Sequence, residues 1–242
     1  MEPVKFLPAG DSAVSVQFGN VIDPAVYQRV HALQLQLDRA KLPGIVEVLP
    51  TYRALMVHYD PGILPFAVLV KELNQLIASP FSEGKHSRKV ITIPVCFGGE
   101  LGEDLDFVAQ YHHTTSEEIV RLFGSEDFLI YMLGFTPGYP YIGGVPDGLA
   151  TPRLETPRVK IPAGSVGIGG KQLGIYPIVS PGGFQLVGRT PVRLYDPGRE
   201  QPILLEAGEY IRFQAVSREE YDEILCQVEA GRYTCRIEED EG

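Results

Sequence analysis

One stretch, GFTPGYPYIGG at residues 134–144, constrains the fold more than any other, because it lies in an uncharged run from 128 to 146. A helix that spans a bilayer needs about 20 mostly apolar residues, and this run is nearly that long. However, four glycines and three prolines follow Leu133, and they would leave backbone groups without hydrogen-bond partners in lipid. The sequence therefore predicts a short strand, Phe128–Leu133, and then a loop shaped by glycine and proline.

The charge of the chain argues against two classes of partner. A formal charge of −10 over 242 residues disfavours nucleic acid or an anionic membrane, since both need a basic face. The N-terminus, MEPVKFLPAG, lacks the basic start and long apolar region of a secretory signal, so we expect a cytoplasmic protein. Cys96, Cys226 and Cys235 fit no CxxC spacing and are expected to be buried or unreactive thiols. No HExxH or clustered Cys/His pattern occurs, so no bound metal is predicted.

Two amphipathic helices and several alternating segments fill the first third of the chain. Asp23 and Pro24 supply an N-cap and a first-turn proline, and apolar residues then recur at helical spacing as far as Leu42. A second helical pattern covers residues 64–78, and segments such as AVSVQF alternate with the period of a strand. Two helices against a small antiparallel sheet predict an α+β sandwich of the ferredoxin-like kind.

Short strands dominate the rest of the chain. The polar segment 79–89 has no periodicity, and it separates an N-terminal domain at 1–84 from a second domain at 90–242. A helical pair at 104–123 and a last helix at 217–230 remain. Between them, short strands and Gly/Pro turns recur at the regular spacing that is typical of a β-barrel. The final segment, CRIEEDEG, is expected to be frayed.

Three cations, Arg153, Arg158 and Lys160, fall within eight residues of an otherwise acidic chain, beside the glycine-rich turn AGSVGIGG. Such a cluster suits an anion, whereas proline-flanked arginines can also protect an exposed strand edge. Spacing alone favours the strand-edge interpretation. The turn is not a P-loop, because Ser165 stands at the first glycine position and Gln172 replaces the final Ser or Thr.

The usual groups for acid–base or nucleophilic catalysis are sparse. AGSVG misses the GxSxG nucleophile motif by one residue, and all five histidines lie at or before His113. His112 and His113 are neighbours on a predicted helix and point in different directions, so we expect solvated surface. Asp147 and Glu155 are possible acid–base groups, although solvated loop carboxylates are commoner.

Three segments together carry a family resemblance: GFTPGYPYIGG, TPRLETPRVKIPAGSVGIGG and GIYPIVSPGGFQLVGRTP. In order and spacing they resemble allophanate hydrolase subunit 1, a family that includes the B subunit of bacterial 5-oxoprolinase and a sporulation-kinase inhibitor. PAGDSAVSVQFGN and VCFGGELGEDLDFVA resemble the starts of the two family domains, so the resemblance covers nearly the whole chain. It implies an α/β domain followed by a cyclophilin-like β-barrel.

The resemblance also implies an enzyme complex. The chain would act beside a homologous C subunit, similar to allophanate hydrolase subunit 2, and a third component, to open the lactam of 5-oxoproline to glutamate. ATP would be used by the complex and need not be bound by this chain. Two alternatives within the family are an inhibitor of a sensor histidine kinase, and a component of an allophanate- or urea-type amide hydrolase or carboxyltransferase. A prolyl isomerase is suggested by barrel analogy alone.

The implied pocket would hold a small amide together with a carboxylate or phosphoryl group, which guanidinium groups bind in bidentate fashion. Arg189 is either a pocket cation or part of a salt bridge that locks its strand. No catalytic acid or base is identified. The expected substrate- or anion-binding residues are Arg153, Arg158, Lys160, Ser165, Gln172, Gln185 and Arg189, and the expected pocket wall is Phe135, Tyr139, Tyr141, Tyr176 and Phe184.

The sequence departs from the family pattern at three positions. Phe184 stands where the family has Trp, Leu173 where it has Thr, and Phe123 where it has His. Phe184 keeps apolar bulk but lacks the indole donor, and Leu173 lacks a hydroxyl. Either change can alter substrate choice within the family.

Overall fold

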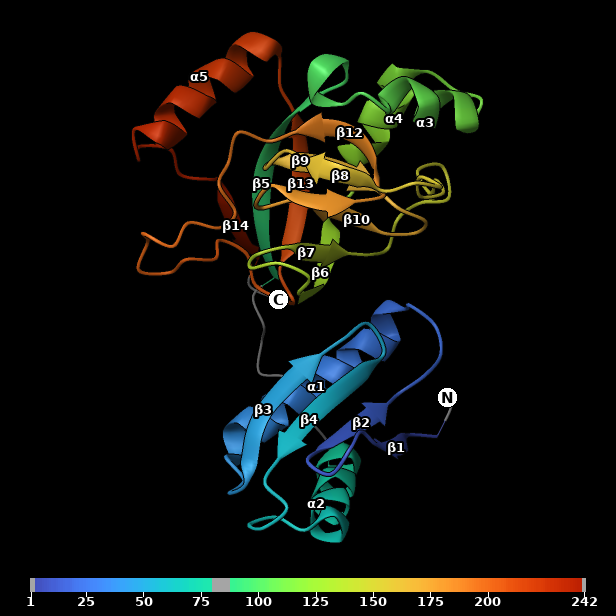
Figure 1. Ribbon diagram of the computed structural model, residues 1–242, viewed down its shortest axis with the longest axis vertical. Helices are drawn as coiled ribbons and strands as arrows, with labels where there is room; N and C mark the ends of the chain where they lie inside the picture. The colour runs from blue at the N-terminus through green and yellow to red at the C-terminus, as the bar shows by residue number, and fades with distance from the viewer. Residues whose placement is uncertain (1–2, 80–87, 241–242) are drawn as a thin grey trace. The chain divides into compact units, whose positions relative to one another are not determined.

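The computed structural model describes residues 3–79 and 88–240, and the chain divides into two units, residues 1–86 and 87–242 (Figure 1). The domain boundary expected in the segment 79–89 falls largely on residues 80–87, which lie outside the described residues. Each unit contains a separate cluster of buried apolar side chains, so each has a hydrophobic core of its own.

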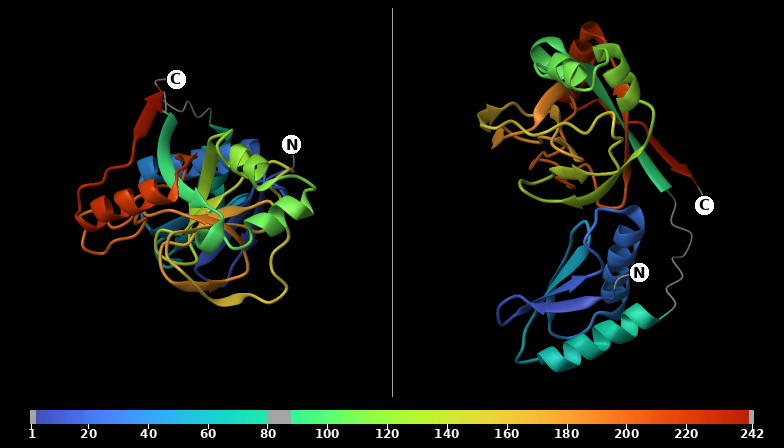
Figure 2. Two further views of the ribbon diagram at one scale, coloured as in Figure 1. Left: turned by 90° about the horizontal axis from the view of Figure 1, so that it is seen from above. Right: turned by 90° about the vertical axis from the view of Figure 1, so that its right-hand side faces the viewer.

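The N-terminal unit is a four-stranded antiparallel sheet with two helices packed on one face (Figure 2). Its elements are β1 (Lys5–Pro8), β2 (Ala13–Gln17), α1 (Pro24–Ala40), β3 (Ile45–Pro50), β4 (Ala54–Tyr59) and α2 (Phe66–Ala78), and the strand order is β1-β2-β4-β3. Alternate residues of β2 and β4 are buried, with Val14 opposite Val57 and Val16 opposite Leu55. This period of two directs one face of the sheet towards the helices.

The first helix begins where the sequence predicts. The side chain of Asp23 accepts a hydrogen bond from the backbone N–H of Ala25 at 2.7 Å, and Pro24 is the first helical residue. The α+β class is observed, but the ferredoxin-like assignment is not confirmed. The elements follow one another as ββαββα, whereas a ferredoxin-like domain has the order βαββαβ.

Seven strands of the second unit close into a mixed β-barrel (Figure 1). They are β5 (Arg88–Phe97), β6 (Phe128–Leu133), β7 (Pro140–Ile142), β9 (Ser165–Ile168), β10 (Leu173–Ile175), β12 (Gln185–Arg189) and β13 (Tyr210–Ala215). Their order is β12-β9-β10-β7-β6-β13-β5, and a pairing between β12 and β5 closes the ring. Only β13 and β5 run parallel among these described pairs. The predicted barrel is confirmed.

Helices and a two-stranded ribbon lie around the barrel. They are the 3-10 helix η1 (Gly99–Leu101), α3 (Leu105–Tyr111), α4 (Ser116–Phe123), α5 (Arg218–Glu229), and the ribbon strands β8 (Arg158–Ile161) and β11 (Ser180–Gly182). Phe123 of α4 is fully buried, and its ring meets that of Phe213 edge-on at 5.4 Å. The aromatic ring at this position, where the resemblance leads us to expect a histidine, therefore fills the core.

The uncharged run folds as β6, a loop and β7, so its strand prediction holds. Within residues 3–79 and 88–240, no helix combines the length and the apolar character that crossing a membrane requires.

The last strand corrects the prediction of a frayed end. β14 (Ile237–Asp240) pairs antiparallel with β5, from Ile237 opposite Ile91 to Asp240 opposite Arg88. Glu238 accepts a hydrogen bond from Arg212 of β13 at 2.8 Å. The described part of the acidic tail is therefore ordered by backbone pairing with β5 and by Arg212 of β13, and neither partner is visible from local composition.

Asp127 forms ion pairs with arginines on two neighbouring barrel strands, Arg88 on β5 and Arg212 on β13. Its carboxylate is 9% exposed and accepts two hydrogen bonds from Arg212, at 2.7 and 2.8 Å, and one from Arg88 at 2.8 Å. The hydrogen bonds from Arg212, ahead of the opposing effect of burial, hold the pKa of Asp127 below its ordinary value.

We expect Asp127→Asn to lower the free energy of unfolding by about 2 kcal/mol at pH 7. A carboxyl whose folded pKa is depressed stabilises the fold above its unfolded pKa of about 4, and that stabilisation is lost as the pH falls through the folded value. The difference between wild type and variant should therefore shrink below about pH 4. Urea unfolding followed by circular dichroism across a pH series measures it, and a difference that stays constant down to about pH 2 would contradict the assignment.

Candidate functional site

Five aromatic side chains from distant parts of the chain meet beside the barrel. Tyr139 is central, and its ring meets those of Phe135, Tyr141 and Tyr176 edge-on or nearly so at 5.4, 5.2 and 5.3 Å. Tyr176 in turn meets Phe184 at 6.3 Å. Together with Arg153 and backbone of residues 181–183, all five line a cavity of about 130 Å³. The structure thus brings the whole predicted pocket wall together, and we call this cavity the aromatic pocket.

Glycine makes room for the two tyrosines at the back of the aromatic pocket. A Cβ on Gly174 would lie 2.2 Å from the hydroxyl oxygen of Tyr139, and one on Gly182 would lie 2.2 Å from that of Tyr176. Both rings are almost completely buried, and burial raises the pKa of Tyr176, so its hydroxyl is neutral. Within the glycine-rich turn itself, a Cβ on Gly169 would lie 2.3 Å from the Phe184 ring, so this glycine too is explained by the close approach of a ring.

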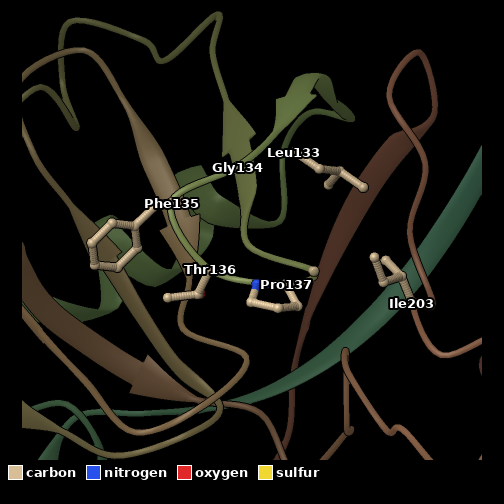
Figure 3. Close-up of a pocket in the computed structure, with 7 residues that line it drawn as sticks. Leu133, Gly134, Phe135, Thr136, Pro137 and Ile203 are labelled. Carbon is tan, nitrogen blue, oxygen red and sulfur yellow. The ribbon is translucent and has the colours of Figure 1, made fainter. Parts of the chain in front are cut away.

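Phe135 forms the rim. It is 58% exposed and has a backbone φ of 62°, a conformation that costs a non-glycine residue about 1–3 kcal/mol. The same loop lines a second, open hollow of about 360 Å³ with Leu133 and Ile203, and Figure 3 shows the Phe135 ring pointing away from both of these side chains. The strained loop thus presents an aromatic ring between two hollows.

Arg153 is the cation of the aromatic pocket. Its guanidinium carbon lies 4.9 Å from the centre of the Phe184 ring, and its Nη2 donates a hydrogen bond to Oε1 of Gln172 at 2.8 Å. The guanidinium makes no ion pair among the described residues and is exposed, so it can receive an anion. Gln185 is buried instead, and its amide donates to the carbonyl of Pro152 at 3.0 Å, which fixes the backbone beside Arg153.

Arg158 serves a different purpose from Arg153. Its guanidinium pairs with Asp104 at 2.8 Å and Glu103 at 3.0 Å, and it also donates to the carbonyl of Phe184 at 3.3 Å. Its charge is therefore already compensated. Lys160 is exposed and has no ion pair in the described part of the chain. Neither Arg158 nor Lys160 lines the aromatic pocket.

Asp104 is a residue that sequence reasoning missed. Besides Arg158, its carboxylate accepts a hydrogen bond from the backbone N–H of Leu186 at 2.6 Å, and its own N–H donates to the carbonyl of Leu186 at 2.8 Å. Asp104 thereby connects the start of α3 to Leu186 of β12, two residues along the chain from the pocket residue Phe184. The motif GEDLDF marked this segment, but no spacing rule linked it to Arg158.

Ser165 and Arg189 lie away from the aromatic pocket. They face each other across β9 and β12, and Ser165 is fully buried, with no hydrogen-bond partner for its hydroxyl among the described residues. Arg189 lies near Tyr221 of α5. Burial raises the pKa of Tyr221, and the nearby positive charge of Arg189 partly opposes this rise. Arg189 forms no ion pair in the described part of the chain, so neither of its two predicted roles is observed.

The other titratable candidates are peripheral. His113 is exposed, whereas His112 is partly buried and its Nε2 lies 3.1 Å from the hydroxyl of Thr151, so the prediction of a fully solvated pair fails for His112. Asp147 pairs with Lys171 at 2.8 Å in solvent, and Glu155 is exposed. The described residues contain no group of three His, Cys, Asp or Glu side chains that could hold a metal ion.

The chain is similar to a known family of enzyme domains. The family of the carboxyltransferase domain, subdomain C and D, matches residues 4–205, and the chain belongs to this family. Within it, the chain is 39% identical to the B subunit of 5-oxoprolinase from Bacillus subtilis, over 88% of this chain and 92% of that protein. It is 42% identical to the corresponding B subunit from Haemophilus influenzae, over 87% of this chain and 97% of that protein. The resemblance inferred from the motifs is confirmed.

The fold is also found within a larger enzyme. The crystal structure of Kluyveromyces lactis urea carboxylase matches with a TM-score of 0.78 and 25% identity, over 98% of this chain and 24% of that one. This chain therefore spans nearly the full length of the 5-oxoprolinase subunits but about a quarter of the urea carboxylase.

Proposed function

We propose that this chain is the B subunit of a multi-subunit, ATP-dependent 5-oxoprolinase that opens the lactam of 5-oxoproline to glutamate. The observation that carries the proposal is the match to proteins of that name, at 39% and 42% identity along almost their whole length. The designation of those relatives as subunits indicates that further chains are needed. We place the complex in the cytoplasm, where ATP is available.

The chemistry of the aromatic pocket supports this substrate. 5-Oxoproline is a single five-membered lactam ring with one carboxylate, and a cavity of about 130 Å³ is smaller than the pockets that hold drug-sized ligands. Arg153 would bind the carboxylate, and the lactam ring would pack against Tyr176 and Phe184. Gln172, which Arg153 holds in place, would offer a hydrogen bond to the lactam amide.

The described residues contain no P-loop for ATP. The turn at Gly170 lacks the Ser or Thr of a P-loop, and Lys171 is ion-paired with Asp147 at 2.8 Å. No residue that lines the aromatic pocket is a carboxylate or a histidine. We therefore propose that a homologous C subunit and a third component supply the nucleotide site and the acid–base groups, while this chain binds and orients the amide.

A role in a urea-type carboxyltransferase is the second candidate. The fold match to urea carboxylase covers 98% of this chain, and urea, like the lactam, is a small amide. Phe184, where the resemblance leads us to expect Trp, lines the aromatic pocket and can alter substrate choice there, whereas Leu173 is buried in the barrel core. Urea has no carboxylate, however, and would leave Arg153 without a partner.

Reconstitution distinguishes the candidates. The chain is purified with its co-expressed partner subunits, and ADP release is followed with 5-oxoproline, with urea and with neither. We expect stimulation by 5-oxoproline that disappears when this chain is omitted. Stimulation by urea alone would establish the second candidate, and no stimulation by either amide in an intact complex would refute the proposal.

A further inference from the structure

A further, partly open cavity lies outside the aromatic pocket and is lined by residues of a hairpin and of the end of α5. Residues 194–204 form the hairpin, in which Tyr195 pairs with Ile203 and the N–H of Leu204 donates to the carbonyl of Leu194 at 2.9 Å. The space has a volume of about 380 Å³, within the range of small-molecule pockets. We call it the hairpin cavity, and it is lined by Val192, Arg193, Asp196, Arg199, Leu204, Val228, Gly231, Tyr233, Thr234 and Cys235.

The wall of the hairpin cavity carries more positive than negative charge. Arg193 and Arg199 share one carboxylate, that of Asp196, and each lies 3.9 Å from it, which is longer than a charge-assisted hydrogen bond. Nη2 of Arg199 donates to the carbonyl of Arg193 at 2.8 Å, which fixes the guanidinium. Nε of Arg199 is buried and makes no hydrogen bond within the described residues. One positive charge is therefore only weakly compensated, and one buried donor lacks an acceptor.

Aliphatic side chains form much of the remaining lining, beside the polar side chain of Thr234. Val192, Val228 and Leu204 contribute aliphatic groups, and Cys235, which is 8% exposed, lies near enough to Arg199 to respond to its charge. Burial raises the pKa of the Cys235 thiol to about 11, so this side chain is neutral at ordinary pH. The hairpin cavity thus combines the guanidinium of Arg199, which is held by a hydrogen bond, with aliphatic side chains.

We propose that the hairpin cavity is a second ligand site, which binds a small carboxylate with a short apolar body. The guanidinium of Arg199 takes the carboxylate, and the hydrocarbon part occupies the space between Leu204 and Val228. Neither group belongs to the aromatic pocket, so this proposal does not depend on the proposed function.

Calorimetric titration of the full chain with hexanoate and with uncharged hexanamide tests the proposal. We expect hexanoate to bind, and hexanamide to bind about 10-fold more weakly because it lacks the charge. Arg199→Gln should weaken hexanoate about 10-fold, and Val228→Trp, which fills the cavity, should abolish binding. Arg121→Gln, which removes an exposed arginine on α4, should leave the affinity unchanged within about twofold.

Three results would overturn the proposal. They are no hexanoate binding to the wild-type chain at up to about 10 mM, equal affinity for the two probes, and loss of binding in Arg153→Gln, which would place hexanoate in the aromatic pocket. Because Val228→Trp can disturb packing, its thermal unfolding is compared with that of the wild type. The comparison with hexanamide and the Arg199→Gln variant both leave the aliphatic lining of the cavity unchanged. They therefore test the proposed carboxylate site independently of Val228→Trp.

Discussion

Arg153→Gln is expected to reduce kcat/KM for 5-oxoproline in the reconstituted complex by about 100-fold, which corresponds to about 2.7 kcal/mol. Arg153 is the cation that lines the aromatic pocket, and its guanidinium has no carboxylate partner among the described residues. Glutamine can still donate a hydrogen bond, but it cannot compensate the charge of a substrate carboxylate. Steady-state rates of ADP release over a range of 5-oxoproline concentrations measure the effect.

The stability of the chain should hardly change in Arg153→Gln. The side chain is exposed, and its contacts with Phe184 and Gln172 are worth less than about 1 kcal/mol at such a site. Arg121→Gln is a matched control, because Arg121 is also exposed, is bonded to Glu118 and does not line the aromatic pocket. A loss of less than about threefold in kcat/KM for Arg153→Gln would remove the carboxylate-binding role.

Asp104→Asn is expected to lower the free energy of unfolding of the barrel by about 3 kcal/mol. The carboxylate is 14% exposed and joins the side chain of Arg158 to the backbone of Leu186, at 2.8 and 2.6 Å. Without the charge of Asp104, Arg158 keeps Glu103, which is largely solvated, as its charged partner, together with a hydrogen bond to the carbonyl of Phe184. Urea unfolding monitored by circular dichroism gives the difference.

Asp147→Asn is the control for this effect. Asp147 also forms an ion pair at 2.8 Å, with Lys171, but both side chains are exposed, so its loss should cost no more than about 0.5 kcal/mol. Equal effects of the two substitutions would show that the Asp104 contacts contribute no more than a surface ion pair. In that case the structural role assigned to Arg158 would be wrong.

The features that sequence predicted are those that depend on near neighbours. The regular spacing of Gly/Pro turns predicted a barrel, and Asp23 and Pro24 placed a helix start, because both signals act within a few residues. The five aromatic residues expected in the pocket wall do lie together, and three of them, Phe135, Tyr139 and Tyr141, are close neighbours in the sequence.

The features that sequence missed depend on distant partners. Arg153 and Arg158 belong to the same repeated phrase, TPR, and nothing in the neighbouring sequence distinguishes the arginine that lines the pocket from the one that forms ion pairs. The difference comes from Asp104, which is 54 residues from Arg158 and is brought to it only by the packing of α3 on β12. The order in β14 likewise depends on β5 and on Arg212, far away in the sequence.

The parallel pairing of β5 with β13 has a consequence for biosynthesis. Val90 pairs with Tyr210 and Val95 with Ala215. During translation, β5 is therefore synthesised long before β13, the strand with which it pairs. Until then the nascent chain holds a long apolar strand with bare edges, which is a state prone to association with other chains. The N-terminal unit, whose strands and helices are all close in sequence, has no such delay. Yield in cells should therefore depend on how well the ribosome-bound barrel is protected by chaperones.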